Sequence, residues 1–183
     1  EADAEALVNT VNEVGVMGKG IALMFREAFP DSSRAYAEAC ERGEVQVGRV
    51  LVTENMGLTG PRWIIHFPTK KHWRNPSQLP WVREGLQDLA RVVAEKKIRS
   101  IAVPPLGCGQ GGLDWSQVRS EIEAALGKVS GLEVQVYEPV QAYQNAPKRQ
   151  GVLALTIPRA LIAEMVRRYS VLGIGCSNLE VQK

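Results

Sequence analysis

Two glycine-rich turns are the parts of this sequence best suited to hold a ligand. The first lies in "LVNTVNEVGVMGKGIALMF" (7–25), where an apolar strand leads through Asn9, Asn12 and three glycines into an amphipathic helix. Glycines let the backbone approach a ligand closely, and the following helix directs free N–H groups and its positive dipole end into the turn. Asparagine amides can also donate to and accept from sugar hydroxyls. The turn therefore favours an anionic ligand.

The second turn, in "SIAVPPLGCGQGGLDWSQVRSEIEAAL" (100–126), repeats this order of strand, turn and helix, with Asp114 expected to cap the helix. The alternative for either turn taken singly is a tight strand-to-helix connection that binds no ligand. In that case Asn9 and Asn12 would form only an Asx turn and a cap. Two such turns in one small domain favour a ligand site, because both would face one crevice at the carboxyl ends of the strands.

Neither turn fully matches a nucleotide-binding motif. A Walker A loop requires Ser or Thr after its lysine, but Lys19 is followed by glycine. The G-x-G-x-x-G spacing does occur from Gly107 to Gly112. That motif also needs an acid at a strand end about 20 residues later, and Glu121 and Glu123 fit poorly because they fall in a predicted helix. A dinucleotide-dependent oxidoreductase remains a less favoured alternative.

The segment "RWIIHFPTKKHWR" (62–74) contains four basic residues, both histidines and two tryptophans, but no acid. Rings that stack on bases, with cations that follow phosphates, are typical of single-stranded nucleic-acid binding. Alternatively, Trp63 belongs to the core and Trp73 only packs beside Pro76. His66 lies on an apolar strand and is expected to be a buried core histidine. The candidate contacts to a nucleobase or DNA strand are His72, Trp73 and Arg74.

Composition indicates one folded domain with an appendage. The 183 residues are 45% hydrophobic and 23% charged, and the net charge of +2 is too small to prove nucleic-acid binding, so any basic patch must be local. Cys40, Cys108 and Cys176 lie far apart, which disfavours a disulfide framework or a cysteine-rich zinc site and fits a reducing cytoplasm. No apolar run approaches the roughly 18 residues of a membrane span, and no signal peptide is evident.

Strands and helices alternate along residues 1–139, which predicts an α/β sandwich. Met24 is expected on the apolar side of the first helix, which Pro30 ends. The predicted strands are 5–11, 48–55, 62–69, one beginning at 100, and 132–139. The predicted helices are 17–28, 32–42, 79–97 and one from 114 or 115 to 126.

Beyond residue 139 the periodicity is lost. Residues 140–155 are predicted to be a linker, and 156–183 a helical segment with Ser177 as a candidate N-cap. The sequence begins without Met, directly before a strand, and ends within a predicted helix. We therefore expect a fragment truncated at both ends.

Several motifs of this sequence resemble those of a known family. "ALVNTVN" with its glycine loop, and "VPPLGCGQGGL", are similar to the two ligand loops of macrodomains, which bind ADP-ribose. More closely, "NTVNEVGVMGKGIALMF", "GEVQVGRV", "FPTKKHWR" and "LGCGQGGLDW" resemble the macrodomain of DarG antitoxins, relatives of the terminal ADP-ribose glycohydrolase type. The resemblance covers residues 1 to about 139 and implies a three-layer α/β/α sandwich with a mixed central sheet.

The resemblance also implies a function. It is the removal of ADP-ribose from thymidine bases in single-stranded DNA, without metal or organic cofactor, as the antitoxin of a DarT-like toxin in the bacterial cytoplasm. Lys70 matches the catalytic lysine that attacks the anomeric carbon, and Asn12 would hold the distal ribose. The implied ADP-ribose contacts are Asn9, Gly15, Val16, Met17, Gly18, Lys19, Gly20, Ile21, Pro105, Leu106, Gly107, Cys108, Gly109, Gln110, Gly111 and Tyr137.

The sequence departs from the family pattern at two places. Human-type relatives carry an aspartate where this chain has Gly111, and Asp114 is expected to cap a helix instead. The first strand of the family, with the acid that contacts adenine, is missing, and Glu1 and Asp3 lie too late to replace it. Two alternatives stay open: a binding-only ADP-ribose reader, and a hydrolase of ADP-ribosylated protein or of a small acyl-ADP-ribose.

Overall fold

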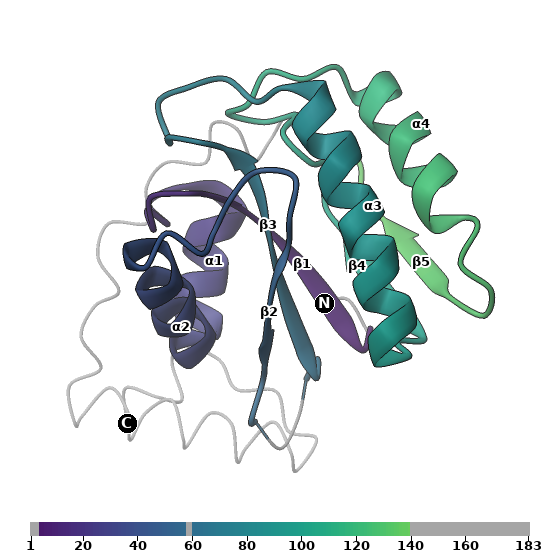
Figure 1. Cartoon of the computed structure of the whole chain (residues 1–183), viewed down its shortest axis with the longest axis horizontal. Coiled ribbons are helices and arrows are strands. Elements are labelled where there is room, and N and C mark those ends of the chain that lie inside the picture. The colour runs from purple at the N-terminus through teal and green to yellow at the C-terminus, as the bar shows by residue number, and fades with distance from the viewer. Residues whose placement is uncertain (1–3, 58–59, 140–183) are drawn as a thin grey trace, which may run out of the picture. The chain divides into compact units, whose positions relative to one another are not determined.

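The computed structural model describes residues 4–57 and 60–139, which form a five-stranded sheet covered by helices on both faces (Figure 1). The strands are β1 (Ala6–Asn12), β2 (Leu51–Glu54), β3 (Trp63–Lys70), β4 (Ser100–Val103) and β5 (Glu133–Val136). The helices are α1 (Gly20–Ala28), α2 (Pro30–Glu41), α3 (Leu79–Lys96) and α4 (Trp115–Leu126). The predicted α/β/α sandwich is confirmed, whereas the predicted linker and C-terminal helices lie outside the described residues. Among the described helices, none is long and apolar enough to cross a membrane.

The sheet is mixed, with strand order β2-β3-β1-β4-β5. β1 lies at its centre and pairs in parallel with β3 and β4, and β4 pairs in parallel with β5. Only β2 runs antiparallel, against β3. The carboxyl ends of four strands therefore meet at one edge, where ligands of open α/β sheets usually bind.

Side chains alternate between the two faces of the sheet, as strand geometry requires. Val8 on β1 and Phe67 on β3 belong to the larger core, which α3 and α4 cover. Val11 on β1 belongs to a smaller core with Met17 and Tyr36, on the side of α1 and α2 (Figure 1). Both faces are thus buried, which makes the central strands nearly continuous apolar runs.

Helix boundaries follow local sequence signals, with two corrections. Asp114 caps α4 by accepting a hydrogen bond from the N–H of Gln117, as predicted. Helix α1 begins at Gly20 rather than at residue 17, because 17–19 remain part of the loop. Met24 is 59% exposed, so its predicted place on the buried side of α1 is wrong; Ala22 and Phe25 are buried there instead.

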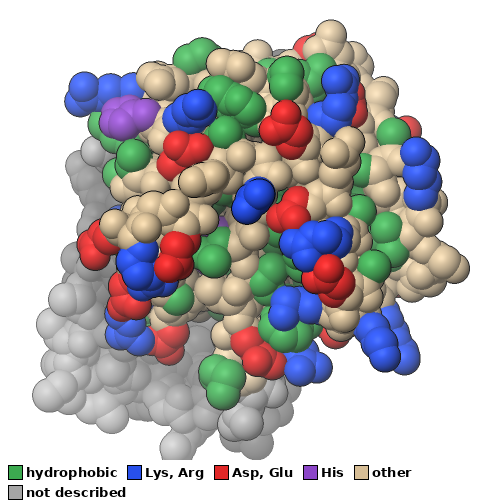
Figure 2. All heavy atoms as spheres, viewed as in Figure 1, with side chains coloured by type: hydrophobic (Ala, Val, Ile, Leu, Met, Phe, Trp, Pro, Cys, Tyr) green, Lys and Arg blue, Asp and Glu red, His purple; other side chains and the backbone are tan. Residues whose placement is uncertain are grey.

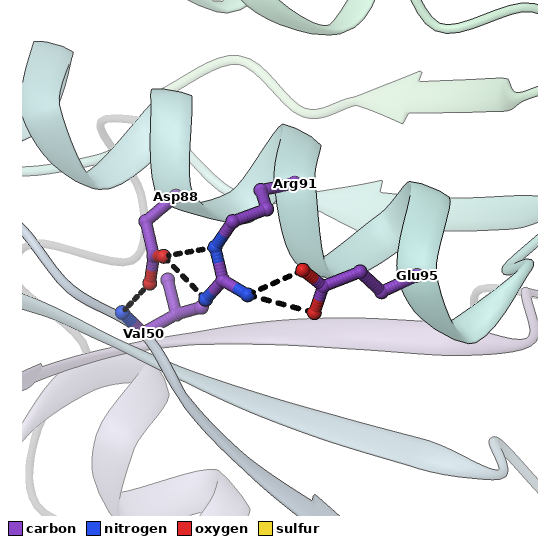
Figure 3. Close-up of polar contacts among 4 residues, drawn as sticks. All are labelled: Val50, Asp88, Arg91 and Glu95. Carbon is purple, nitrogen blue, oxygen red and sulfur yellow. Dashed lines mark hydrogen bonds and ion pairs between the residues drawn. The ribbon is translucent and has the colours of Figure 1, made fainter.

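Polar contacts fasten α3 to the segment that leads into β2 (Figure 3). Asp88 accepts a hydrogen bond of 2.9 Å from the backbone N–H of Val50. Its other oxygen accepts from Arg91, whose guanidinium also pairs with Glu95. The backbone contact matters most, because exposed ion pairs contribute only about 0–1 kcal/mol.

Close packing of α3 on the sheet predicts the effect of Gly85→Ala. A Cβ at residue 85 would lie 2.5 Å from Cζ of the fully buried Phe67. Overpacking costs about 1–3 kcal/mol, more than the roughly 1 kcal/mol that alanine gains over glycine in a helix. We expect a net loss of unfolding free energy, measured by urea titration. Gln87→Ala, on the exposed side of α3, is the control, and a Gly85→Ala protein as stable as that control would contradict this packing.

Candidate functional site at the carboxyl edge of the sheet

Lys70, the last residue of β3, lies where the two glycine loops meet. Its backbone carbonyl accepts a hydrogen bond of 3.1 Å from the N–H of Glu13, at the start of the first loop. Its Nζ donates a hydrogen bond of 2.5 Å to the carbonyl of Gln110, in the second loop. One residue thus joins the segments that follow β1, β3 and β4.

The Lys70 amine is poorly hydrated. The residue is only 8% exposed, and burial lowers the pKa of its amine. Within the described residues no carboxylate forms an ion pair with it. A buried amine without a counter-charge holds a larger neutral fraction near pH 7, and a neutral amine can act as a nucleophile or base.

Asn12 shapes the first loop. Its Oδ1 accepts hydrogen bonds from the N–H groups of Val14 (3.0 Å) and Val16 (3.2 Å), and its Nδ2 donates to the Val16 carbonyl at 2.7 Å. These three bonds engage the amide and form the Asx turn considered above. In this structure Asn12 therefore positions the loop, and its contact with the distal ribose stays a prediction. Tyr36 on α2 supports it by donating to the Asn12 carbonyl at 2.7 Å.

Asn9 is fully buried beneath this loop, and its Nδ2 lies 3.4 Å from Nδ1 of His66. Asn9 exposes no surface to a ligand in this structure, and its contact with ADP-ribose stays a prediction. His66 stacks on Tyr36 with ring centroids 4.9 Å apart and lies 3.0 Å from Ser32 Oγ through Nε2. His66 is therefore a core histidine, as predicted, and burial lowers its pKa to about 4.

Both loops carry backbone N–H groups without a partner among the described residues. In the second loop, Cys108, Gly112 and Leu113 donate within the loop. The free donors are the N–H groups of Gly109, Gln110 and Gly111 there, and of Met17, Gly18 and Lys19 in the first loop. Consecutive free N–H groups of this kind bind anions such as phosphate.

The side chains of these loops offer little to a ligand. Met17 is 3% and Leu106 0% exposed, and each packs in a core, so only their backbones can meet a ligand. Burial raises the pKa of the Cys108 thiol to about 11, which leaves it unreactive near pH 7. Beside the first loop, Gly15–Gly18 and the side chains of Arg26 and Arg34 line a hollow of about 480 Å³.

The second loop packs directly on Ser77, which sequence reasoning missed. The N–H of Ser77 donates to the Gly111 carbonyl at 3.0 Å. A Cβ at residue 111 would overlap both the Gly107 carbonyl oxygen and Ser77 Oγ. No side chain fits there, so the absence of an aspartate at 111 has a steric reason. The Ser77 hydroxyl is buried and has no partner among the described residues.

The predicted basic and aromatic strip divides into two. His72, Trp73 and Arg74 follow Lys70 at the site: His72 stacks on Trp73 with centroids 5.3 Å apart, and the Arg74 guanidinium lies 4.5 Å from the Trp73 ring. Trp73 is 45% exposed. Trp63 instead begins β3, so the eight residues of that strand place it at the opposite edge of the sheet from Lys70.

Tyr137 directly follows β5 at the site edge, where its N–H donates to the Val103 carbonyl at 2.9 Å. Its side chain is 46% exposed, so the ring is accessible there. Across the described part of the chain, no three His, Cys, Asp or Glu side chains gather to hold a metal.

Comparison with known proteins relates this site to one family. The Macro domain family profile matches residues 8–122. The DNA ADP-ribosyl glycohydrolase of Thermus aquaticus is 50% identical over 189 residues, which cover 100% of this chain and 51% of that protein. The solved macrodomain of Mycobacterium tuberculosis DarG is 52% identical, with a TM-score of 0.75, and the match covers 76% of this chain and 91% of that one.

A more distant relative joins two activities. A DNA ADP-ribosyl transferase-DNA ADP-ribosyl glycohydrolase fusion protein of Thermosipho africanus is 34% identical over 152 residues, or 75% of this chain and 39% of that protein. The solved structure of Thermosipho africanus DarTG in complex with ADP-ribose matches with a TM-score of 0.69 and 34% identity, over 75% of this chain and 38% of that one. The chain thus spans about half the length, or less, of the full-length relatives it matches.

The buried His66 beneath the first loop predicts a loss of stability in mild acid. Its pKa is about 4 when folded and about 6.5 when unfolded, so the unfolded state binds the proton more tightly. The stabilisation is complete above about pH 6.5 and is lost as the pH falls toward 4. By pH 5 the free energy of unfolding has fallen by about 2 kcal/mol.

Urea titrations at pH 7.5 and pH 5 measure this loss, with His66→Gln as the variant that should show a smaller loss. The ring resonances of His66 in NMR spectra provide a second readout and should not titrate above about pH 5. A histidine that titrates near pH 6.5 in the folded protein would refute this account.

Proposed function

The chain belongs to the macrodomain family, and from this premise we propose that it is a DNA ADP-ribosyl glycohydrolase that removes ADP-ribose from thymidine in single-stranded DNA. The observation that carries the proposal is Lys70, a buried amine held between two loops that present free N–H groups. The names of the relatives supply the DNA and the ADP-ribosyl group, and the resemblance supplies thymidine.

The two loops would hold the diphosphate of ADP-ribose. The N–H groups of Gly109–Gly111 and of Met17–Lys19 donate to phosphate oxygens, and the exposed Lys19 adds a positive charge. The Asn12 bonds fix the first loop before the ligand arrives, so less entropy is lost when it binds. In this proposal the diphosphate places the distal ribose over Lys70.

Lys70 would supply the nucleophile. Its neutral amine adds to the anomeric carbon, and the N-glycosidic bond breaks. The bonding electron pair leaves with the base nitrogen, which takes up a proton. The ribose opens to an iminium with Lys70, and water then hydrolyses this adduct to release ADP-ribose and the free amine.

The Gln110 carbonyl orients this amine by accepting its hydrogen bond at 2.5 Å. Burial lowers the pKa of Lys70, and a neutral acceptor opposes that shift less than a carboxylate in the same place would. The site therefore relies on burial to keep the amine reactive.

The substrate strand would contact the exposed stack of His72, Trp73 and Arg74. It directly follows Lys70 and combines a stacked ring pair with a cation. Bases stack on such rings, and cations follow the phosphates. As the fused Thermosipho relative suggests, we further propose that the modified strand is the product of a DarT-like DNA ADP-ribosyl transferase, with which this chain is associated.

The lysine mechanism is tested with Lys70→Ala. We expect kcat for release of ADP-ribose from a thymidine-modified single-stranded oligonucleotide to fall by about 100-fold or more, since the covalent step is lost. The affinity for free ADP-ribose, measured by calorimetry, should stay within about threefold, because the backbone N–H donors remain. Lys70→Arg, which keeps the charge but not the nucleophile, should be equally inactive.

Since burial lowers the pKa of Lys70, the wild-type rate should rise with pH and level off below the ordinary lysine value of about 10.4. Undiminished turnover by Lys70→Ala would contradict the mechanism. Inactivity of both the wild type and Lys70→Ala, with ADP-ribose binding intact, would favour a binding-only reader.

The contact with DNA is tested with Trp73→Ala. Loss of one stacking ring should lower kcat/KM for the modified oligonucleotide by about tenfold or more, because stacking contributes about 1–3 kcal/mol per base. Trp73→Phe, which keeps a ring, should retain most of the activity. Free ADP-ribose should bind both variants equally. An equal loss of kcat/KM for a small acyl-ADP-ribose would instead mean that Trp73 acts on the sugar end.

A further inference from the structure

A second basic surface lies at the amino edge of the sheet, opposite the Lys70 site. It is a hollow of about 650 Å³ between the carboxyl end of α3 and the segment that joins α4 to β5. The N–H of Arg99 donates to Glu5 Oε2 at 2.9 Å, which places the hollow beside the starts of β1 and β4. The residues that line it are Val93, Ala94, Lys97, Ile98, Arg99, Lys128, Val129, Ser130 and Gly131.

Three cations line this hollow without a carboxylate among them. Lys97, Arg99 and Lys128 are all exposed, and within the described part of the chain none of them forms an ion pair. Among the other arginines at the positions that the structure describes, six of nine do have acidic partners, namely Arg34, Arg42, Arg62, Arg83, Arg91 and Arg119. Cations gathered without partners repel one another, so an anion that bound them would be stabilised.

Further positive charge flanks the hollow. The Lys96 ammonium lies 4.2 Å from the Trp63 ring centroid, and the Arg62 guanidinium, which is paired with Glu54, lies 4.8 Å from it. Figure 2 shows Lys and Arg side chains at the lower edge of this face, beyond the end of α3. Glu5 and Glu133 are the nearby acids, but Glu5 is engaged by the Arg99 backbone.

We propose that this hollow binds the phosphodiester backbone of the DNA strand on which the Lys70 site acts, an inference that rests on the proposed function. Protein partners favour surfaces rich in aromatic residues and poor in lysine. The exposed large apolar side chains lie elsewhere, and two of the three cations here are lysines. Phosphate is the ligand that such a surface fits best.

The two sites are close enough for one strand to reach both. The eight residues of β3 span the sheet between its two edges, about 26 Å at roughly 3.3 Å per residue. At about 3.4 Å per nucleotide, this length corresponds to about eight nucleotides, so a strand of about 20 nucleotides is long enough to reach both edges over the surface. A longer strand would gain contacts at the hollow that a trinucleotide lacks.

The test is a triple variant, Lys97→Asn, Arg99→Gln and Lys128→Gln. Asn is chosen at residue 97 because its φ of 56° is left-handed, a conformation that Asn tolerates. The matched control is Arg42→Gln, Arg91→Gln and Arg119→Gln, which removes the same charge from ion-paired positions elsewhere. Thermal unfolding of both variants checks that they are folded.

Binding of an unmodified single strand of about 20 nucleotides is measured across salt concentration. Loss of three phosphate contacts should reduce the slope of log K against log salt by about 2, since each contributes about 0.7. From about 50 to 200 mM salt, wild type should then lose about 16-fold more affinity than the triple variant. The control should behave as wild type, and release of ADP-ribose from a modified trinucleotide should be equal in all three.

An unchanged salt slope in the triple variant would overturn the assignment of the hollow to DNA. Equal losses in the triple variant and the control would also overturn it, because net charge alone would then explain the effect. Failure of the proposed function looks different: the wild-type protein would release no ADP-ribose from either substrate, while the binding comparison would still report on the hollow.

Discussion

The hydrogen bond from Lys70 Nζ to the Gln110 carbonyl is the contact on which the site depends. β1, β3 and β4 run parallel and end at one edge, but parallel pairing alone does not define how the following loops approach one another. Lys70 joins them by accepting from Glu13 through its backbone and donating to Gln110 through its side chain. The same contact buries the amine, so the architecture that closes the site also lowers the pKa of its reactive group.

Beneath the first loop, a buried polar cluster carries structure rather than chemistry. Asn9, His66 and Tyr36 occupy positions on the α1 and α2 side that apolar residues could fill at lower desolvation cost. In return, the Tyr36 hydroxyl reaches the Asn12 carbonyl, and Asn12 in turn holds Val14 and Val16. Polar groups with directional bonds define one loop conformation, which apolar packing would leave less specified.

Local signals predicted the order and type of every described element, because glycines, prolines and Asp114 mark their ends. Long-range contacts could not be predicted in this way. Nothing near Tyr36 or Ser77 in the sequence indicates that one supports Asn12 and the other the second loop. The local sequence around Lys70 indicates only an ordinary lysine at the end of a strand. The family resemblance alone identifies it as a candidate catalytic residue. The composition of 62–74 could not decide whether Trp63 belongs to the basic and aromatic strip or to the core, because composition does not include the length of the strand that separates Trp63 from Trp73.

The packing of Gly111 on Ser77 sets a further condition on the chemistry. A carboxylate at residue 111 would need a Cβ where the Gly107 carbonyl and Ser77 Oγ already lie. The close approach of this loop therefore excludes an acid beside Lys70 at that position. A nearby carboxylate would favour the ammonium form, whereas burial alone favours the neutral amine. In this chain the tight packing at Gly111 and the burial of Lys70 therefore act together: the loop leaves no room for an acid at residue 111, and burial lowers the pKa of the amine without an opposing carboxylate there.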